Sequence, residues 1–372
     1  MQPSRLRGLD GIRGLAALFV VIDHIYLRAF PGYPVDNAPW WAGWFIYGRF
    51  AVVVFIVLSG FSLSVAPARH DWRLGGVSTF ARRRAWRILP PYWAALVFSV
   101  LMTWFVVAQP GWPEPTGRSI VVNAALLQDA IVVPSPNRAF WSIAIEAQLY
   151  ILLPLMLLTI RHFGRTAMVS TVALAVITLG LAAPYSAQIQ YTLDLAVLFA
   201  VGVAAAGIVR AGERVRGWPW RWFALIAAVP VVALILVKGS VWTIDNFFWV
   251  DIAWAPAIAL LLVAVATGRP RLLDSRPARG LGRISYSLYL THAPIVIAVY
   301  YGVVEGRVAP GVPTFFVLIA TVVPLTVGFA AIFASVFELP FQRHRGWAAL
   351  RDAARRRTPE PEPEAPAVAR VS

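Results

Sequence analysis

Cysteine is absent from this chain of 372 residues, and charged residues make up only 14% of it. The absence of cysteine excludes a disulfide framework, a thiolate nucleophile, a zinc–thiolate site and an iron–sulfur cluster. A soluble domain carries about 25% charged residues, whereas this chain is 59% hydrophobic with a mean hydropathy of +0.68. These features predict a polytopic membrane protein and leave no room for a second soluble domain.

Lysine is almost absent too, because Lys238 is the only one and arginine supplies the other basic residues. The formal net charge is +15, which raises the question of nucleic acid binding. The arginines are concentrated in alternate loops, however, as topology-determining charges are. We therefore interpret the charge as a topology signal that also contacts anionic lipid headgroups, and we expect no nucleic acid partner.

Apolar runs of about 20 residues predict membrane helices, and ten such runs occur. They lie at approximately 11–30, 43–66, 90–109, 139–160, 167–184, 190–209, 222–238, 247–267, 284–304 and 313–336. The N-terminal segment and every second loop carry 26 basic residues, and the opposite set of loops carries 5. The positive-inside rule then predicts that both termini are cytoplasmic. We expect an all-α bundle of about ten spans over residues 1–342.

The ends of the chain and one loop carry further predictions. No cleavage site follows a short apolar core, so the first run is predicted to be a retained helix and not a signal peptide. The Pro-rich loop 110–138 is predicted to hold a short interfacial helix at 118–130. Residues 343–372 are predicted to form a tail that is basic and amphipathic up to residue 357. Its Pro/Glu-rich end is then expected to be disordered.

Two ionisable residues, Arg13 and His24, lie in the first apolar run. Eleven residues of α-helix rise ~16 Å and return almost to the starting direction, so both side chains project from one face. Ionisable residues inside a membrane helix are costly and indicate a functional site. Topology signalling by Arg13 and hydrogen bonding of His24 to a neighbouring helix are the structural alternatives.

The predicted topology also assigns a depth to the other polar residues. Glu146 in the fourth run falls in the same layer as His24, where the two side chains would pair, although Glu146 neutralising Arg49 is an alternative. Asp194 and Asp251 are predicted to be helix-packing partners or counter-charges. On the inner side lie Arg13, Glu338 and a cluster of arginines, Arg82, Arg83, Arg84 and Arg87. This layout suits an anionic donor that enters at the arginines and threads its reactive end inward.

Five segments in this order resemble the acyltransferase-3 family of integral membrane O-acyltransferases. They are RLRGLDGIRGLAALFVVIDH (5–24), GRFAVVVFIVLSGFSL (48–63), ARRRAWRILPPYW (81–93), FWSIAIEAQLYILLPL (140–155) and LGRISYSLYLTH (281–292). Glu338–Pro340 closes the pattern as E-x-P. Ala51 stands where the family usually has Gly, and Val53 and Ile56 also depart from it. No hydrolase-like domain of the kind fused to some members is seen, so we expect transfer to be completed within the membrane domain.

By this resemblance, Arg13 and His24 match the family's R-x10-H, Arg84 and Arg87 match its R-x-x-R, and Glu146 matches its W-S-x-x-x-E. The resemblance implies transfer of an acyl group, commonly acetyl, from acyl-CoA to a hydroxyl in the bacterial cytoplasmic membrane. His24 is then the candidate general base, oriented by Glu146 or Asp23. Arg13, Arg84 and Arg87 would hold the anionic donor. We assign the rest of the donor site to Ser59, Tyr289, His292 and Glu338, and we expect no metal.

Some alternatives stay open from the sequence. A covalent acyl-His24 intermediate is one. The acceptor is a carbohydrate of the cell envelope or a macrolide-type secondary metabolite. A transporter or flippase of lipid-linked sugars would also place charges in a polar cavity, and a non-catalytic receptor or scaffold is the third class.

Overall fold

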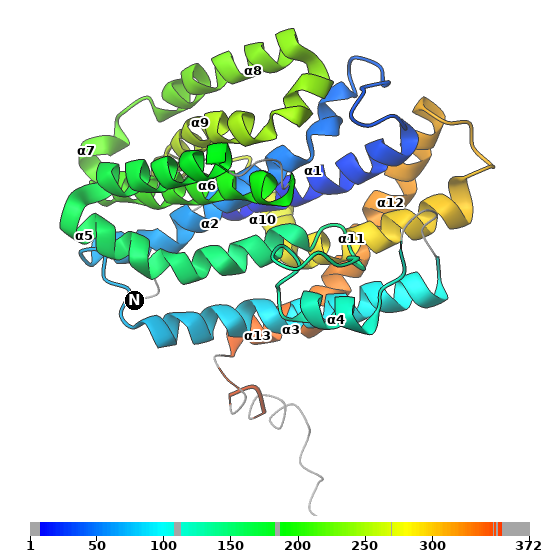
Figure 1. Ribbon diagram of the computed structural model, residues 1–372, viewed down its shortest axis with the longest axis horizontal. Coiled ribbons are helices and arrows are strands. Elements are labelled where there is room, and N and C mark those ends of the chain that lie inside the picture. Colours follow the sequence, from blue (N-terminus) through cyan, green and yellow to red (C-terminus); the bar gives the residue numbers. More distant parts are fainter. Residues whose placement is uncertain are drawn as a thin grey trace, which may run out of the picture.

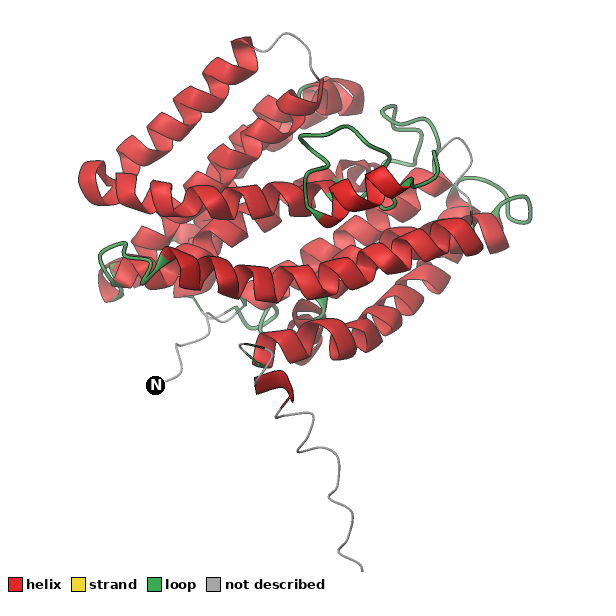
Figure 2. Cartoon of the chain, turned by 60° about the horizontal axis from the view of Figure 1, so that its bottom comes forward, coloured by secondary structure: helices red, strands yellow, loops and turns green. Residues whose placement is uncertain are grey.

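The computed structural model describes residues 8–107, 113–182, 187–268, 270–344, 346 and 349–351. All the regular secondary structure of these residues is helical, and the long helices form a bundle (Figures 1 and 2). The prediction of an all-α polytopic bundle is confirmed.

The helices follow one another along the chain, and the longest loops precede η1 and α5. In chain order they are α1 (Leu9–Ala29), η1 (Gly43–Tyr47), α2 (Arg49–Arg69), α3 (Val77–Phe105), α4 (Gly117–Ala124), α5 (Trp141–Ala182), α6 (Ala187–Arg210), α7 (Glu213–Arg216), α8 (Trp220–Asp245), α9 (Phe247–Thr267), α10 (Arg276–Arg283), α11 (Ser285–Val299), η2 (Tyr300–Val304), α12 (Val312–Phe333), η3 (Ala334–Glu338) and α13 (Leu339–Arg343). The segment η1 is a 3₁₀-helix, whereas η2 and η3 are π-helical.

Eight helices of the described residues are long and apolar enough to cross a membrane. The helix α1 has 21 residues but carries four charged ones, Asp10, Arg13, Asp23 and Arg28. The helix α5 has 42 residues and breaks at Gly164, where φ is 87° and ψ is 170°. A straight helix of that length would measure ~63 Å, about twice the hydrocarbon core of a bilayer. With α1 added and the two arms of α5 counted separately, the helices correspond to the ten predicted spans.

Glycines bring α2 and α6 into backbone contact. A Cβ placed on Gly60 would lie 2.3 Å from the carbonyl oxygen of Phe199, and one on Gly202 would lie 2.2 Å from that of Val57. Small residues of this kind let helices approach closely in a membrane, where packing rather than water exclusion drives association. The contact fixes α2, which carries Arg49 and Ser59.

A second close approach lies at the beginning of α1. A Cβ on Gly282 of α10 would lie 2.0 Å from the carbonyl oxygen of Asp10, and one on Gly14 would lie 2.7 Å from the Gly282 nitrogen. These contacts press α10 against the first turns of α1, next to Arg13. The junction between α10 and α11 is thereby brought to the arginine-rich end of the bundle.

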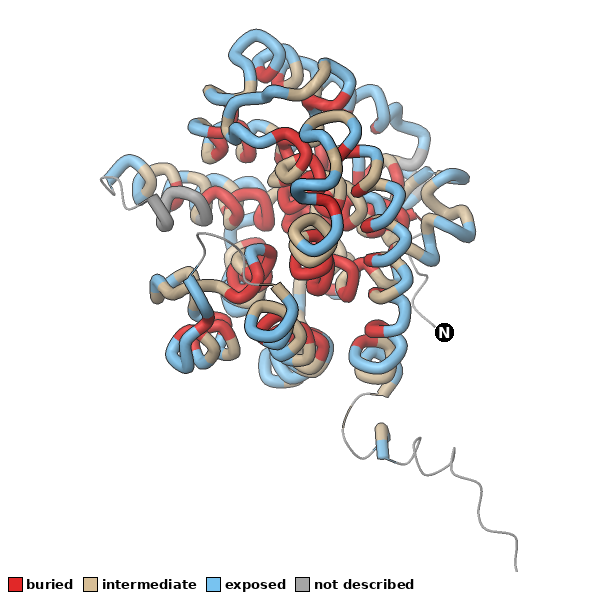
Figure 3. Tube along the Cα trace, turned by 90° about the vertical axis from the view of Figure 1, so that its right-hand side faces the viewer, coloured by how far each residue is buried: buried red, intermediate tan, exposed pale blue. Residues whose placement is uncertain are grey.

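Buried residues occupy the interior of the bundle, whereas the outward faces are exposed (Figure 3). Many exposed side chains are large and apolar, among them Phe105, Ile151 and Val237. Such faces suit contact with lipid.

The structure describes most of the loop before α5 but little of the C-terminal tail. The short helix predicted at 118–130 is seen as α4, and it ends six residues earlier than predicted, at Ala124. A capping box between Thr116 and Ser119 fixes its beginning, and Leu126 adopts a positive φ of 59° beyond its end. The predicted tail, 343–372, lies largely outside the described residues.

Candidate active site

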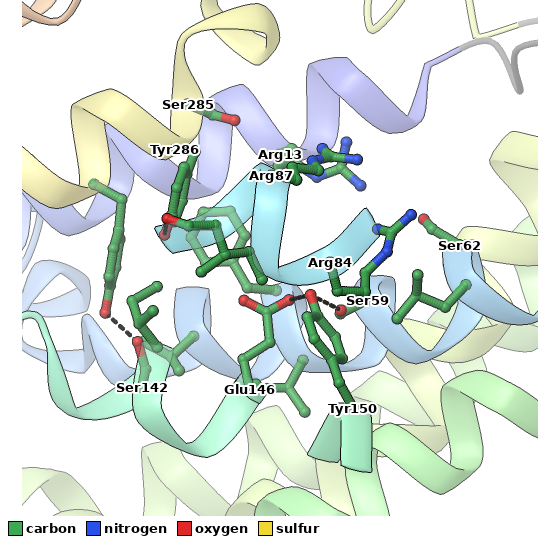
Figure 4. A pocket seen from close by; sticks show the side chains of 17 residues that line it. Arg13, Ser59, Ser62, Arg84, Arg87, Ser142, Glu146, Tyr150, Ser285 and Tyr286 are labelled. Carbon is green, nitrogen blue, oxygen red and sulfur yellow. Dashed lines mark hydrogen bonds between the residues drawn. The ribbon is translucent and has the colours of Figure 1, made fainter. Parts of the chain in front are cut away.

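A cavity of ≈ 200 Å³ lies among α1, α2, α3, α5 and α11, and we call it the inner cavity (Figure 4). Arg13, Arg84 and Arg87 line it together with a single acidic residue of the described chain, Glu146. The guanidinium of Arg13 also pairs with Asp10 at 3.1 Å. The Nε of Arg84 is buried without a hydrogen-bond partner. The lining of the inner cavity therefore carries an excess of positive charge.

The two arginines of the R-x-x-R lie one helical turn apart on α3 and reach the inner cavity together. Their neighbours Arg82 and Arg83 are exposed and do not line it. Figure 4 shows Arg13 and Arg87 close together on one side of the cavity, with Arg84 nearer to Ser62. The predicted convergence of Arg13, Arg84 and Arg87 is therefore present in the fold.

A chain of hydroxyl groups leads to Glu146. The Tyr150 hydroxyl donates to Oε1 of Glu146, and the Ser59 Oγ lies 3.2 Å from the Tyr150 oxygen. Because the tyrosine has one hydrogen to give, Ser59 donates to it. Tyr150 was not among the residues predicted from the sequence, although its i, i+4 spacing from Glu146 places both on one face of α5.

A second cavity, of ≈ 230 Å³, lies toward the other end of α1, and we call it the outer cavity. Its polar lining includes Asp23, His24, Tyr33, Arg49 and Arg138. The Nδ1 of His24 lies 3.0 Å from the carbonyl oxygen of Val20 and 3.3 Å from the Asp23 carboxylate. Both partners only accept hydrogen bonds, so Nδ1 carries the hydrogen and Nε2 is the nitrogen that can take a proton.

His24 and Glu146 are not brought together. Glu146 lines the inner cavity and binds Tyr150, whereas His24 lines the outer cavity and binds Asp23. Trp141, the first residue of α5, reaches the outer cavity, and Glu146 is five residues, or ~7.5 Å, further along the helix. Of the two orienting residues left open by the sequence, the geometry favours Asp23.

His292 packs against His24 and lines neither the inner nor the outer cavity. The two imidazole rings are 4.6 Å apart between centroids and nearly perpendicular, at 88°. The His292 Nδ1 lies 2.8 Å from the Tyr289 carbonyl oxygen, and its Nε2 is buried without a partner. His292 thus contacts the candidate base, and its predicted place in the donor site stays a prediction.

Arg49 is neutralised by aspartates from two other helices. Its Nη2 lies 3.1 Å from Asp194 of α6, and its Nε donates to Asp251 of α9. Its guanidinium also lies over the rings of Trp141 and Phe247, at 5.4 and 5.3 Å. Asp194 and Asp251 thus act as the predicted counter-charges, and Glu146 does not neutralise Arg49.

A third cavity, of ≈ 360 Å³, adjoins the inner cavity and shares Arg13, Arg87, Ser285 and Tyr286 with it. We call it the vestibule, and Arg283 and Arg343 add further positive charge to its lining.

Glu338 also lines the vestibule. Its Oε2 accepts from the Ser287 backbone N–H at 3.1 Å and from the Ser287 Oγ at 2.6 Å, and its Oε1 accepts from Gln342 at 2.8 Å. Glu338 therefore ties the beginning of α11 to η3 and α13.

Comparison with known proteins identifies the family to which this chain belongs. The fold and cavities define a polytopic helical membrane protein in which an arginine-lined cavity and a histidine–aspartate pair lie along one helix. The acyltransferase-3 family model, described as an acyltransferase domain, matches residues 6–334. The chain belongs to this family, and it is an integral membrane protein whose relatives are bacterial.

Three relatives illustrate the similarity. The O-acetyltransferase OatA of Staphylococcus aureus (strain NCTC 8325 / PS 47) is 24% identical over 94% of this chain and 59% of its own length. A putative membrane-bound transacylase, BcsY of Komagataeibacter xylinus, is 27% identical over 83% of this chain and 78% of its own. The putative peptidoglycan O-acetyltransferase YrhL of Bacillus subtilis (strain 168) is 24% identical over 78% and 48%.

The chain thus spans 59% of the length of the first of these relatives. No solved structure matches it. Among the described residues, no group of three or more His, Asp or Glu is placed to hold a metal ion.

Proposed function

We propose that this protein transfers an acyl group, typically acetyl, from acyl-CoA to a hydroxyl group of an acceptor in the outer cavity. One observation carries the proposal. An arginine-lined cavity and a His–Asp pair lie along one membrane helix, in a chain that belongs to an acyltransferase family. Two relatives are named an O-acetyltransferase and a putative peptidoglycan O-acetyltransferase, and these names support acetyl as the group and oxygen as the acceptor atom.

The donor's phosphates are proposed to bind Arg13, Arg84 and Arg87 and to extend into the vestibule. Arginine suits this role because its planar fork binds phosphate oxygens in pairs. The uncharged acyl arm would then lie along the inner cavity toward His24, which is ~16 Å further along α1. The charged groups of the donor would stay at the arginine-rich end, so only the arm would enter the depth of the membrane.

His24 is proposed to act as general base through Nε2. It takes the proton of the acceptor hydroxyl as that oxygen adds to the thioester carbonyl, and Asp23 stabilises the resulting imidazolium. When the tetrahedral intermediate collapses, the carbon–sulfur bond breaks and the thiolate recovers the proton from His24. The products are an ester and the CoA thiol. In the alternative chemistry, Nε2 itself attacks the carbonyl, and the carbon–sulfur bond breaks to release the CoA thiol. The acceptor hydroxyl then attacks the acyl-imidazole, the carbon–nitrogen bond breaks, and the imidazole of His24 leaves and takes the hydroxyl proton.

The proposed acceptor is a carbohydrate of the cell envelope. The outer cavity combines hydrogen-bonding groups from Tyr33, Arg49 and Arg138 with the aromatic side chain of Trp141. Sugars present hydroxyls to such donors and apolar ring faces to aromatic side chains. One relative is named a putative peptidoglycan O-acetyltransferase, which supports the same class of acceptor.

The test uses purified protein in detergent with acetyl-CoA and a panel of envelope glycan fragments. We expect thiol release that depends on the acceptor and equals the amount of acetylated product detected by mass spectrometry. Transport requires two compartments, so a transporter or flippase would give no thiol release in this single-compartment assay. Failure of acetyl-CoA either to bind or to react with any acceptor would contradict the proposal.

A further inference from the structure

The inner and outer cavities meet at two side chains. Val52 of α2 and Tyr289 of α11 line both of them. Arg13 and the arginines of α3 lie at one end of this path, and His24 lies toward the other. Tyr289 is the larger of the two shared side chains and is only 5% exposed, so its ring stands where the cavities would otherwise join.

Contacts from three helices hold this ring in place. The Tyr289 hydroxyl lies 2.7 Å from the Ser142 Oγ of α5, a hydrogen bond that Figure 4 shows at Ser142. The ring packs against Phe55 of α2 at 5.7 Å between centroids and against His292 of α11 at 5.8 Å. A side chain anchored at its polar tip and packed at its faces holds one position until that anchor is released.

We propose that Tyr289, anchored by Ser142, is the partition that separates the donor side of this protein from the acceptor side. Two polar cavities that reach into a membrane from opposite ends would form a continuous aqueous path if nothing closed them. Water and small ions would then cross the bilayer. A thioester in the inner cavity would also meet water from the acceptor side and be lost to hydrolysis.

The Tyr289 ring must also be able to move, so that the donor can reach His24. An acyl arm held at the arginines reaches His24 only if the Tyr289 ring moves aside, which requires the hydrogen bond to Ser142 to break. Part of this inference rests on the proposed function, namely the protection of a thioester. The closure of the path does not rest on it and can be measured without any acyl donor.

The absence of cysteine makes the closure directly measurable. Single cysteines are introduced at Ser59, which lines the inner cavity, and at Val20, which lines the outer one. In sealed proteoliposomes of known orientation, a membrane-impermeant maleimide is added to one side or the other. We expect Ser59→Cys to be labelled only from the side of the membrane at which Arg13 and the vestibule lie. Val20→Cys should be labelled only from the opposite side.

Replacement of the partition should remove this sidedness. In a Tyr289→Ala background, each cysteine should be labelled from both sides. The matched control is Tyr286→Ala, because Tyr286 lies on the same helix and lines the inner cavity and vestibule but not the outer cavity. Labelling in that background should stay one-sided. The proposal is overturned if Ser59→Cys is labelled from both sides with Tyr289 intact, or stays one-sided in a folded Tyr289→Ala protein.

If Tyr289→Ala does not fold, Tyr289→Phe and Ser142→Ala keep the ring and remove only its anchor. Each should speed labelling of Ser59→Cys from the far side several-fold, and an unchanged rate in both would overturn the role of the anchor.

Acetyl-CoA turnover without acceptor gives a second readout. In Tyr289→Ala, thiol release should rise several-fold relative to acceptor-dependent transfer, because water reaches the thioester. If the unaltered protein consumes no acetyl-CoA, the proposed function fails, and the labelling alone decides the partition.

Discussion

The backbone N–H of Gly48 donates to a carboxylate oxygen of Asp23 at 3.1 Å, and a Cβ at position 48 would lie 2.2 Å from the Asp23 Cγ. The carboxylate that contacts His24 is therefore seated against bare backbone. Any side chain at position 48 would displace Asp23, although φ there is an ordinary −54°.

Gly48→Ala should therefore impair catalysis with little effect on donor binding. Displacement of Asp23 removes the group that orients His24, and a misplacement of ~1 Å can cost about 100-fold in rate. We expect kcat to fall about 10- to 100-fold and KM for acetyl-CoA to change little, as measured by thiol release. The control is Gly328→Ala in α12, where a Cβ meets nothing within 4 Å. Equal kcat values for Gly48→Ala and Gly328→Ala would contradict the role of Gly48 in positioning the Asp23 carboxylate.

Arg84→Gln should weaken donor binding. A hydrogen bond to a charged group contributes about 1.5–3 kcal/mol, and each 1.4 kcal/mol is tenfold, so KM for acetyl-CoA should rise about 10- to 100-fold. Arg83→Gln removes the same charge from the adjacent, exposed position. It should leave KM within about twofold of the unaltered protein. Equal shifts in both variants would indicate general attraction of the donor to a positive surface and not a built site.

Gly60→Ala should destabilise the bundle by about 1–3 kcal/mol, because overpacking forces backbone to shift. The added methyl group would lie 2.3 Å from the Phe199 carbonyl oxygen, which belongs to a rigid helix and not to a flexible side chain. Thermal unfolding in detergent, measured at equal protein concentration, checks this. Gly328→Ala serves again as the control and should be neutral or slightly stabilising. An unchanged midpoint for Gly60→Ala would show that α2 and α6 can separate at little cost.

Asp129, in the loop before α5, makes stability depend on pH. Burial raises the pKa of Asp129 from its ordinary 3.8 to about 6, and its Oδ2 is buried without a hydrogen-bond partner. The folded state therefore binds this proton more tightly than the unfolded state does, so its contribution to stability is complete below pH 3.8. That contribution is lost as pH rises through about 6.

Asp129→Asn should remove this dependence. The variant should unfold at a higher temperature than the unaltered protein at neutral pH, and the difference should shrink as pH falls toward 4. A difference that is constant over this range would show that Asp129 is ionised alike in both states.

The positions of the membrane helices could be predicted from the sequence, because membrane spans are recognised by their length and hydropathy. It also places Arg13 and His24 on one face of one helix, since that relationship is local. The boundary inside α5 could be predicted as well, because Arg161, His162 and Arg165 separate two apolar runs, and the chain turns there at Gly164, where φ is positive.

Relationships between helices could not be predicted in the same way. Arg49 pairs with residues 145 and 202 positions away, and nothing in the local pattern specifies those partners. The predicted depths put Glu146 level with His24, but depth along the membrane does not fix the position of a helix around the bundle. Lateral packing decides it, and here it turns Glu146 toward Tyr150 and the arginines.

The rate of acetyl transfer by His24→Ala is the most direct test of the proposed mechanism. The variant protein should insert, fold and bind acetyl-CoA as the unaltered protein does, because His24 lines the outer cavity whereas Arg13, Arg84 and Arg87 line the inner cavity. Its acceptor-dependent thiol release should fall about 100- to 10,000-fold, the range that a general base contributes. Turnover within a few-fold of the unaltered protein would contradict the central role of this imidazole.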